Sequence, residues 1–191
     1  LSDSYPTGSL LEGLENAGFE VNQELVDFYT EYRADRPMVG MWGQDWTIPE
    51  PTVDECEAAG VFESAKEYSD KAVVVIARSG GEGADLPTSL DPEVEDTFNA
   101  EGGMFGASGL RYSENKDDLD ASKHFLELTN RERAMLERVT SEYEDVVVVV
   151  NAANAMELGF VEEYDSISSV LWCPGTGQSG FNSLGSILAG E

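Results

Sequence analysis

Three short segments of the chain are continuously apolar and rich in β-branched residues: Ala72–Ala77, Val146–Val150 and Ser169–Trp172. Apolar runs without alternating polar positions are typical of strands buried on both faces, as in parallel sheets. A fourth and shorter segment, Gly18–Asn22, is predicted to form an early strand. The hydrophobic pattern therefore predicts a mostly parallel sheet.

Amphipathic segments with helix start signals alternate with these strands. Ser9–Glu12 and Thr129–Glu132 each place Ser or Thr three residues before Glu, which is the arrangement of a capping box. Ser64–Glu67 is a weaker signal of the same kind, and Gly18 is the expected end of the first helix. Further helices are predicted over residues 22–34, 155–164 and 179–189.

The alternation of strands and helices predicts an α/β fold, a flavodoxin-like three-layer sandwich with helices on both faces of the sheet. We expect one domain over residues 1–191, with a polar, glycine-rich loop insertion at about 86–123. Residues 37–51 form a second irregular region, in which Trp42 and Trp46 either cover an edge of the core or stack on a sugar ring. Both ends of the chain read as points inside a longer protein, so we expect an excised domain.

The composition is strongly acidic, with 38 Asp and Glu against 11 Lys and Arg and a net charge of −27. Such a charge repels polyanions, which predicts no nucleic-acid partner and no binding to anionic membranes. No apolar run approaches the roughly 20 residues of a membrane-spanning helix. Two cysteines, Cys56 and Cys173, are too few for a disulfide framework. We expect them to be reduced and partly buried, which fits a bacterial cytoplasm.

A glycine-rich turn at Gly175–Gly180 matches the dinucleotide fingerprint G-x-G-x-x-G, follows a predicted strand and opens a predicted helix. Pro174 interrupts the tight turn that the fingerprint needs. Phe181 and Asn182 stand where a phosphate-binding loop has Lys and Ser or Thr. We therefore favour a closely packed structural turn, with a nucleotide-binding domain as the alternative.

A second glycine-rich loop, Ser79–Asp85, follows directly after the strongest predicted strand. In open α/β sheets, functional sites form at the carboxyl ends of strands. Glu82 lies between Gly81 and Gly83, which allow the backbone to come close to a ligand. Glu82 is either a solvated charge or a functional carboxylate. A glutamate in a loop is usually solvated, but the position of Glu82 after a buried strand gives the two alternatives equal weight.

Two other features are candidate sites. His124 is the only histidine, and no nucleophile motif lies near it in the sequence, so a loop or structural role is expected. The acidic segment Glu114–Asp120 lacks the residue spacing of a calcium loop, so a solvated loop is expected. We predict no metal site and no cofactor.

The chain resembles glycoside hydrolase family 3 in five segments that follow the family's order. KAVVVIARSGGEGADLP is similar to the family's V-V-I-x-R-x-S-G-E-G-x-D, and LELTNRERAMLERV to its L-T-x-x-E-x-x-L-I helix. VVVVVNAANAMEL resembles its V-V-V-L-N-x-x-x-P-M-E-L strand and turn. SSVLWCPGTGQSGFNSLGSILAGE resembles its P-G-Q-E-G-G segment, and LLEGLENAGFEVN its opening helix and strand. Residues of about 37–65 and 86–123 fall outside the resemblance.

The resemblance implies the second domain of a retaining β-glucosidase-like enzyme, which hydrolyses an oligosaccharide or another β-glycoside. It implies that Glu82 is the general acid/base, that Ser79 and Asp85 contact substrate, and that the nucleophilic aspartate lies in a preceding (β/α)8 barrel. Such a barrel alone takes about 250 residues, so these 191 residues by themselves are expected to be inactive. A non-catalytic acidic module that binds carbohydrate or protein is the other alternative.

This sequence departs from the family pattern at a few positions. They are an extra glycine at Gly80–Gly81, Leu86 for an arginine, Ser179 for a glutamate and Ala155 for a proline. These departures bear on the choice of substrate more than on the fold.

Overall fold

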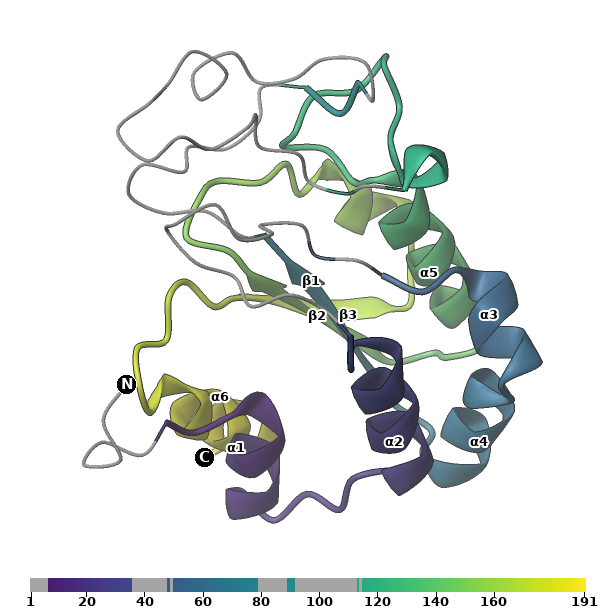
Figure 1. The fold of residues 1–191 in the computed structure, drawn as a ribbon. Helices are drawn as coiled ribbons and strands as arrows, with labels where there is room; N and C mark the ends of the chain where they lie inside the picture. Colours follow the sequence, from purple (N-terminus) through teal and green to yellow (C-terminus); the bar gives the residue numbers. More distant parts are fainter. Residues whose placement is uncertain (1–6, 36–47, 49, 79–88, 92–112, 114) are drawn as a thin grey trace.

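The computed structural model describes residues 7–35, 48, 50–78, 89–91, 113 and 115–191. Its centre is a parallel sheet of three strands in the order β1-β2-β3 (Figure 1). The strands are β1 (Ala72–Ala77), β2 (Val146–Asn151) and β3 (Ile167–Trp172). In the register, Val74 lies opposite Val148, and Val149 lies opposite Leu171. The three strongly apolar segments of the sequence are therefore the strands of one parallel sheet, as predicted.

One face of the sheet packs against α3 (Val53–Ala58), α4 (Val61–Tyr68) and α5 (Asn130–Thr140). The largest core cluster lies here, where every second residue of β1 and β2 is buried among helix side chains. Its strand members are Val74, Ile76, Val146, Val148 and Val150, and its helix members include Cys56, Phe62 and Leu136. Leu25 and Phe28 of α2 (Gln23–Tyr32) pack against the same cluster.

The other face packs against α1 (Leu10–Asn16) and α6 (Gly180–Ala189), which lie side by side in Figure 1. Val149, Cys173 and Leu184 are the buried residues of this layer. Helices thus cover both faces of the sheet, which confirms the three-layer α/β sandwich. On this face of β1, Val73 and Val75 keep 48% and 39% of their surface exposed. The α1–α6 layer therefore packs over β2 and β3 and leaves β1 partly uncovered.

The start signals of α1 and α5 are confirmed. Ser9 and Glu12 form a complete capping box, as do Thr129 and Glu132. A third capping box, Thr52 with Glu55, begins α3 and was not predicted from the sequence. Helix α3 is only six residues long, which is too short for an apolar periodicity to be recognised in the sequence.

Two predicted elements are wrong. Gly18–Asn22 is not a strand: Gly18 has a φ of +87°, and Asn22 caps α2 by accepting from the backbone N–H groups of Glu24 and Leu25. A segment this short forms a strand only beside a partner strand, and it has none among the described residues. Ser64 lies inside α4, which begins one turn earlier at Val61 after Gly60. That earlier start places Val61 and Phe62 in the core.

The predicted helix over residues 155–164 is shorter than expected. Only Gly159–Glu163 is helical, as the 3-10 helix η2, while the other 3-10 helix, η1, covers Lys116–Asp118. The helices predicted at residues 22–34 and 179–189 are confirmed as α2 and α6. None of the helices in the described ranges is long and apolar enough to span a membrane.

Candidate active site at the carboxyl end of the first strand

The residues that the sequence assigns to the site follow directly after β1, in a part of the chain that the structure does not describe. Ser79, Glu82 and Asp85 fall outside the described residues, as do Trp42 and Trp46. Most of the predicted insertion, residues 86–88, 92–112 and 114, falls outside them as well. The site is therefore built from the residues at the carboxyl end of β1, where the loop with Glu82 begins.

Arg78 is the last described residue before that loop, and it is 6% exposed. Its backbone N–H donates to the carbonyl of Asn151 at 3.1 Å, which continues the hydrogen bonds between β1 and β2 beyond the end of the strand. Its guanidinium turns to the α5 side and forms a bidentate ion pair with Glu132, in which Nη2 lies 2.9 Å from Oε2. Bidentate pairing suits the planar guanidinium fork and fixes its orientation.

Glu132 has two structural roles. It is the third residue of α5, where its Oε2 accepts the backbone N–H of Thr129 at 2.9 Å and completes the capping box. The same carboxylate binds Arg78. Thr129 and Glu132 are 1% and 6% exposed, so the capping box and the ion pair are both shielded from water. A carboxylate at a helix N-terminus also interacts favourably with the helix dipole.

The segment before α5 supplies two further contacts to Arg78. The Nη2 of Arg78 donates to the carbonyl of Glu127 at 3.0 Å, and the Cζ of Arg78 lies 5.2 Å from the centroid of the Phe125 ring. A guanidinium over an aromatic face is a favourable cation–π contact. The end of β1 is thus held to β2, to residues 125–127 and to α5.

Part of the acidic segment is also built into this region. Asp118 is fully buried, and its Oδ1 accepts the backbone N–H of Arg131, the second residue of α5, at 3.1 Å. Burial raises the pKa of the Asp118 carboxyl. Asp117 is more exposed and forms an ion pair with the Arg131 side chain at 2.8 Å. The predicted solvated loop is therefore wrong for Asp118, which binds a free amide at the start of a helix.

Glu50 approaches the same helix end from the segment before α3. Burial, and secondarily the Glu132 carboxylate, raise the pKa of Glu50 to about 7. Its backbone carbonyl accepts from the Tyr32 hydroxyl at 2.9 Å and also from the Arg131 guanidinium. Glu50, Asp118 and Glu132 are thus three carboxyls that interact with one another around the N-terminus of α5.

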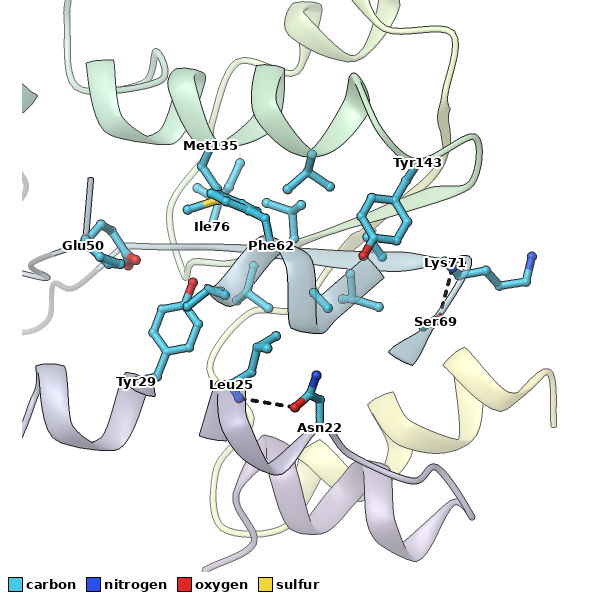
Figure 2. A pocket seen from close by; sticks show the side chains of 18 of the residues that line it. Asn22, Leu25, Tyr29, Glu50, Phe62, Ser69, Lys71, Ile76, Met135 and Tyr143 are labelled. Carbon is cyan, nitrogen blue, oxygen red and sulfur yellow. Dashed lines mark hydrogen bonds between the residues drawn. The ribbon is translucent and has the colours of Figure 1, made fainter. Parts of the chain in front are cut away.

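A cavity of about 250 Å³ runs along β1 between α2, α4 and α5 (Figure 2). Figure 2 shows Glu50 and Tyr29 at one end of the cavity and Ser69 and Lys71 at the other. Its walls between these ends are mainly apolar, with Leu25, Phe62, Ile76, Met135 and Val139 among the lining residues. Sugar rings need several hydrogen-bonding partners, which such walls do not supply. Glu50, Arg131 and Glu132 line this cavity, but Arg78 does not. Because its walls are mainly apolar, we do not expect the catalytic chemistry there.

The glycine-rich turn Gly175–Gly180, which resembles a nucleotide fingerprint, is hydrogen-bonded to the segment before α1. The carbonyl of Gln178 accepts the backbone N–H of Gly8 at 2.7 Å, and Gly177 has a φ of +60°. Close packing, which we expected for the whole turn, holds only at Gly180, where an added Cβ would lie 3.1 Å from the Thr176 Cβ. At Gly175 and Gly177 an added Cβ would meet nothing within 4 Å. The turn therefore uses its glycines partly for backbone conformation.

His124 and the two cysteines are the remaining candidates. The His124 side chain is about half exposed, and its Nε2 lies 3.2 Å from Oε1 of Glu157. The loop or structural role expected for His124 stays a prediction. Cys56 and Cys173 are free, as predicted, and both are buried rather than partly buried. Burial raises the pKa of Cys56 to about 11, so its thiol is protonated at neutral pH. In the described ranges, no group of three or more His, Cys, Asp or Glu side chains could hold a metal ion.

Comparison with known proteins gives the class to which this fold and site belong. Residues 4–191 match the glycosyl hydrolase family 3 C-terminal domain, and the chain belongs to this family. Among its relatives is a beta-glucosidase of Ruminococcus albus, which is 24% identical over 185 residues, covering 95% of this chain and 16% of that protein. Beta-glucosidase A of Butyrivibrio fibrisolvens is 28% identical over 191 residues, covering 96% of this chain and 20% of that protein.

A solved structure has the same fold. A beta-glucosidase from Paenibacillus barengoltzii superposes with a TM-score of 0.61 at 23% identity, covering 98% of this chain and 19% of that one. The chain thus spans a fifth or less of the length of the relatives it matches. The predicted family is confirmed, and the bacterial origin of these relatives agrees with the expected one.

The network around Arg78 was not recognised from the sequence. One signal was available, because a charged residue directly after a buried apolar strand needs a partner if it is buried too. The sequence identified Glu132 as part of a capping box and of the family's helix pattern, but nothing in that local pattern marks it as the partner of a residue 54 positions away.

Proposed function

We propose that this chain is the acid/base-bearing domain of a retaining glycosidase that hydrolyses terminal β-D-glucosidic linkages, or related β-glycosidic ones, in an oligosaccharide or another β-glycoside. The observation that carries the proposal is the place of Glu82, four residues after a buried arginine anchored at the carboxyl end of β1. Three relatives named as beta-glucosidases support the choice of substrate class.

In this proposal Glu82 acts twice. It first protonates the glycosidic oxygen as the bond to the leaving group breaks, while an aspartate of a (β/α)8 barrel outside this chain attacks the anomeric carbon. The Glu82 carboxylate then takes a proton from water, which displaces the aspartate and releases the sugar. The two carboxyls of a retaining site stand about 5–5.5 Å apart. The nearby aspartate and the closed, water-poor site would keep the pKa of Glu82 high enough for it to be an acid.

The other residues of the loop contribute binding. Ser79 and Asp85 hydrogen-bond to the substrate, and the insertion at about 86–123 shapes the aglycone side of the pocket. Residues 1–191 form one domain in this proposal. The expected bacterial cytoplasmic location belongs to it too, and cell fractionation tests that part.

The test is Glu82→Ala in a polypeptide that contains both the barrel and this domain. We expect activity on an aryl β-glucoside with a poor leaving group to be lost, because no acid assists its departure. Added azide should partly restore turnover of a substrate with a good leaving group, because azide needs no general base. Glu144→Ala, an exposed glutamate in a turn, is the matched control and should change neither.

Two outcomes would contradict the proposal. Unchanged turnover by Glu82→Ala would remove this residue from the mechanism. The 191-residue chain by itself should not turn over an aryl β-glucoside, because it lacks the barrel and its nucleophile; measurable turnover would show that the site is complete without them.

A further inference from the structure

The bidentate pair of Arg78 and Glu132 lies between the sheet and the loop that holds the proposed acid/base. We propose that Arg78 and Glu132 are positioning residues for the acid/base step: they hold the end of β1 so that Glu82 reaches the glycosidic oxygen. This inference rests on the proposed role of Glu82. It assigns a function to a buried ion pair whose contribution to stability is by itself a weak reason for its presence.

The first argument is energetic. Burying a guanidinium and a carboxylate removes both from water, and their mutual attraction often does no more than offset that cost. Apolar side chains of similar volume often stabilise such a position equally well or better. The side chains of Arg78 and Glu132 are only 0% and 5% exposed, so their desolvation is nearly complete. Stability alone is therefore a weak reason for a charged pair here.

The second argument is geometric. The backbone of Arg78 is held to Asn151 of β2, and its guanidinium is held by Glu132 and by the carbonyl of Glu127. These contacts, together with the Phe125 ring, fix one residue from three directions. Both the backbone and the side chain of Arg78 have one well-defined place at the end of the sheet.

The third argument is the short distance along the chain. Only three residues, Ser79, Gly80 and Gly81, separate Arg78 from Glu82. The four steps from one Cα to the other span at most about 14 Å, so a displacement of Arg78 is passed on to Glu82 over a short tether. A general acid must lie within hydrogen-bonding reach of the oxygen that it protonates. A misplacement of about 1 Å can lower a rate about 100-fold.

The experiment uses the polypeptide with both barrel and domain, and two variants that keep the shape of the pair. Arg78→Lys keeps the charge and loses the planar fork. Glu132→Gln loses the charge and keeps the capping box, because Gln also serves at that position. For both we expect kcat to fall about 10- to 100-fold on aryl glucosides with poor leaving groups, and much less on those with good ones. Added azide should restore part of the smaller loss on substrates with good leaving groups, where the step that needs the general base limits the rate.

The double variants separate positioning from general destabilisation. If the pair acts through Glu82, Arg78→Lys should have little further effect in a Glu82→Ala background, because the group that it positions is already gone. An equal fractional loss in both backgrounds would overturn the inference. So would an unchanged kcat, with unchanged dependence on the leaving group, in folded Arg78→Lys and Glu132→Gln.

The matched control is the ion pair of Arg133 and Glu163, whose side chains are 34% and 52% exposed. Arg133 also lies on α5, and its Nη1 lies 2.8 Å from Oε2 of Glu163. Arg133→Lys should leave kcat and the leaving-group dependence unchanged. The same assays keep the two proposals apart. No effect of Glu82→Ala would refute the proposed function, whereas a Glu82→Ala effect without an Arg78→Lys effect would refute only the positioning role.

Discussion

At the scale of single residues, the most informative groups are the buried charges around the start of α5. Arg78 and Glu132 neutralise each other, Asp118 binds a helix amide, and Glu50 lies near them with a raised pKa. Arg78, Asp118 and Glu132 are of residue types that are almost never fully buried without a partner, whereas Glu50 is only partly buried. Their position at the end of the strand that leads to the proposed acid/base distinguishes this region from an ordinary solvated surface.

The raised pKa of Glu50 predicts how stability depends on pH. Its pKa rises from 4.5 to about 7 on folding, so between these values the folded chain holds a proton that the unfolded chain has released. The free energy of unfolding therefore falls as the pH rises through this window. At about 1.4 kcal/mol per pKa unit, the full shift amounts to about 3–4 kcal/mol.

Glu50→Gln tests this prediction by urea unfolding at several pH values. The variant should match the parent near pH 4, where both side chains are neutral, and should be the more stable of the two at pH 8. Glu144→Gln, at an exposed turn position, is the control and should not change the pH dependence. Parallel pH curves for Glu50→Gln and the parent would show that Glu50 does not have a raised pKa.

At the scale of elements, helices α1 and α6 are in contact through their backbones. An added Cβ at Gly185 would lie 2.0 Å from the carbonyl oxygen of Gly13, and one at Gly13 would lie 2.2 Å from that of Phe181. These are backbone atoms, which cannot turn aside as a flexible side chain can. The two helices can therefore approach this closely only while both positions are glycine.

Gly185→Ala is expected to destabilise the domain. Alanine favours a helix over glycine by about 1 kcal/mol, but overpacking against a neighbouring backbone costs about 1–3 kcal/mol or more, so the overlap should win. Chemical denaturation measures the difference. Gly175→Ala is the matched control, because its Cβ would meet nothing within 4 Å. Equal stability of Gly185→Ala and the parent would mean that α1 and α6 can separate at little cost.

At the scale of the whole molecule, the net charge of −27 sets the electrostatics. Few basic residues are available to neutralise it, and most of the ion pairs of the described residues, such as Arg133 with Glu163, lie at the surface. Surface pairs of this kind contribute about 0–1 kcal/mol each. In the folded domain, the repulsion between carboxylates is therefore not neutralised by basic side chains.

Salt should stabilise the chain through this repulsion. Raising the salt concentration from about 0.01 M to about 1 M shortens the Debye length from about 30 Å to about 3 Å. We expect Tm to rise by several degrees in thermal unfolding. In a chain of this length, each increase of about 1 kcal/mol in the free energy of unfolding raises Tm by about 2–4 °C. NaCl and KCl should act alike, because screening depends on ionic strength. A Tm that stays constant or falls with salt would contradict this prediction.

The sequence by itself determined the features that depend on near neighbours. The three strands follow from continuous apolar runs, and the starts of α1 and α5 follow from side chains three residues apart. These interactions are local, so a short window of sequence contains all the atoms involved. The order of these segments also identified the family, and with it the fold.

The tertiary structure alone decided which distant residues meet. Gly18–Asn22 has strand-like residues but no neighbouring strand in the part of the chain that is described, and Asp118 belongs to an acidic run yet is fully buried. The pairing of Arg78 with Glu132 joins residues 54 positions apart. Such contacts depend on how helices pack against the sheet, which places together side chains that no local pattern relates.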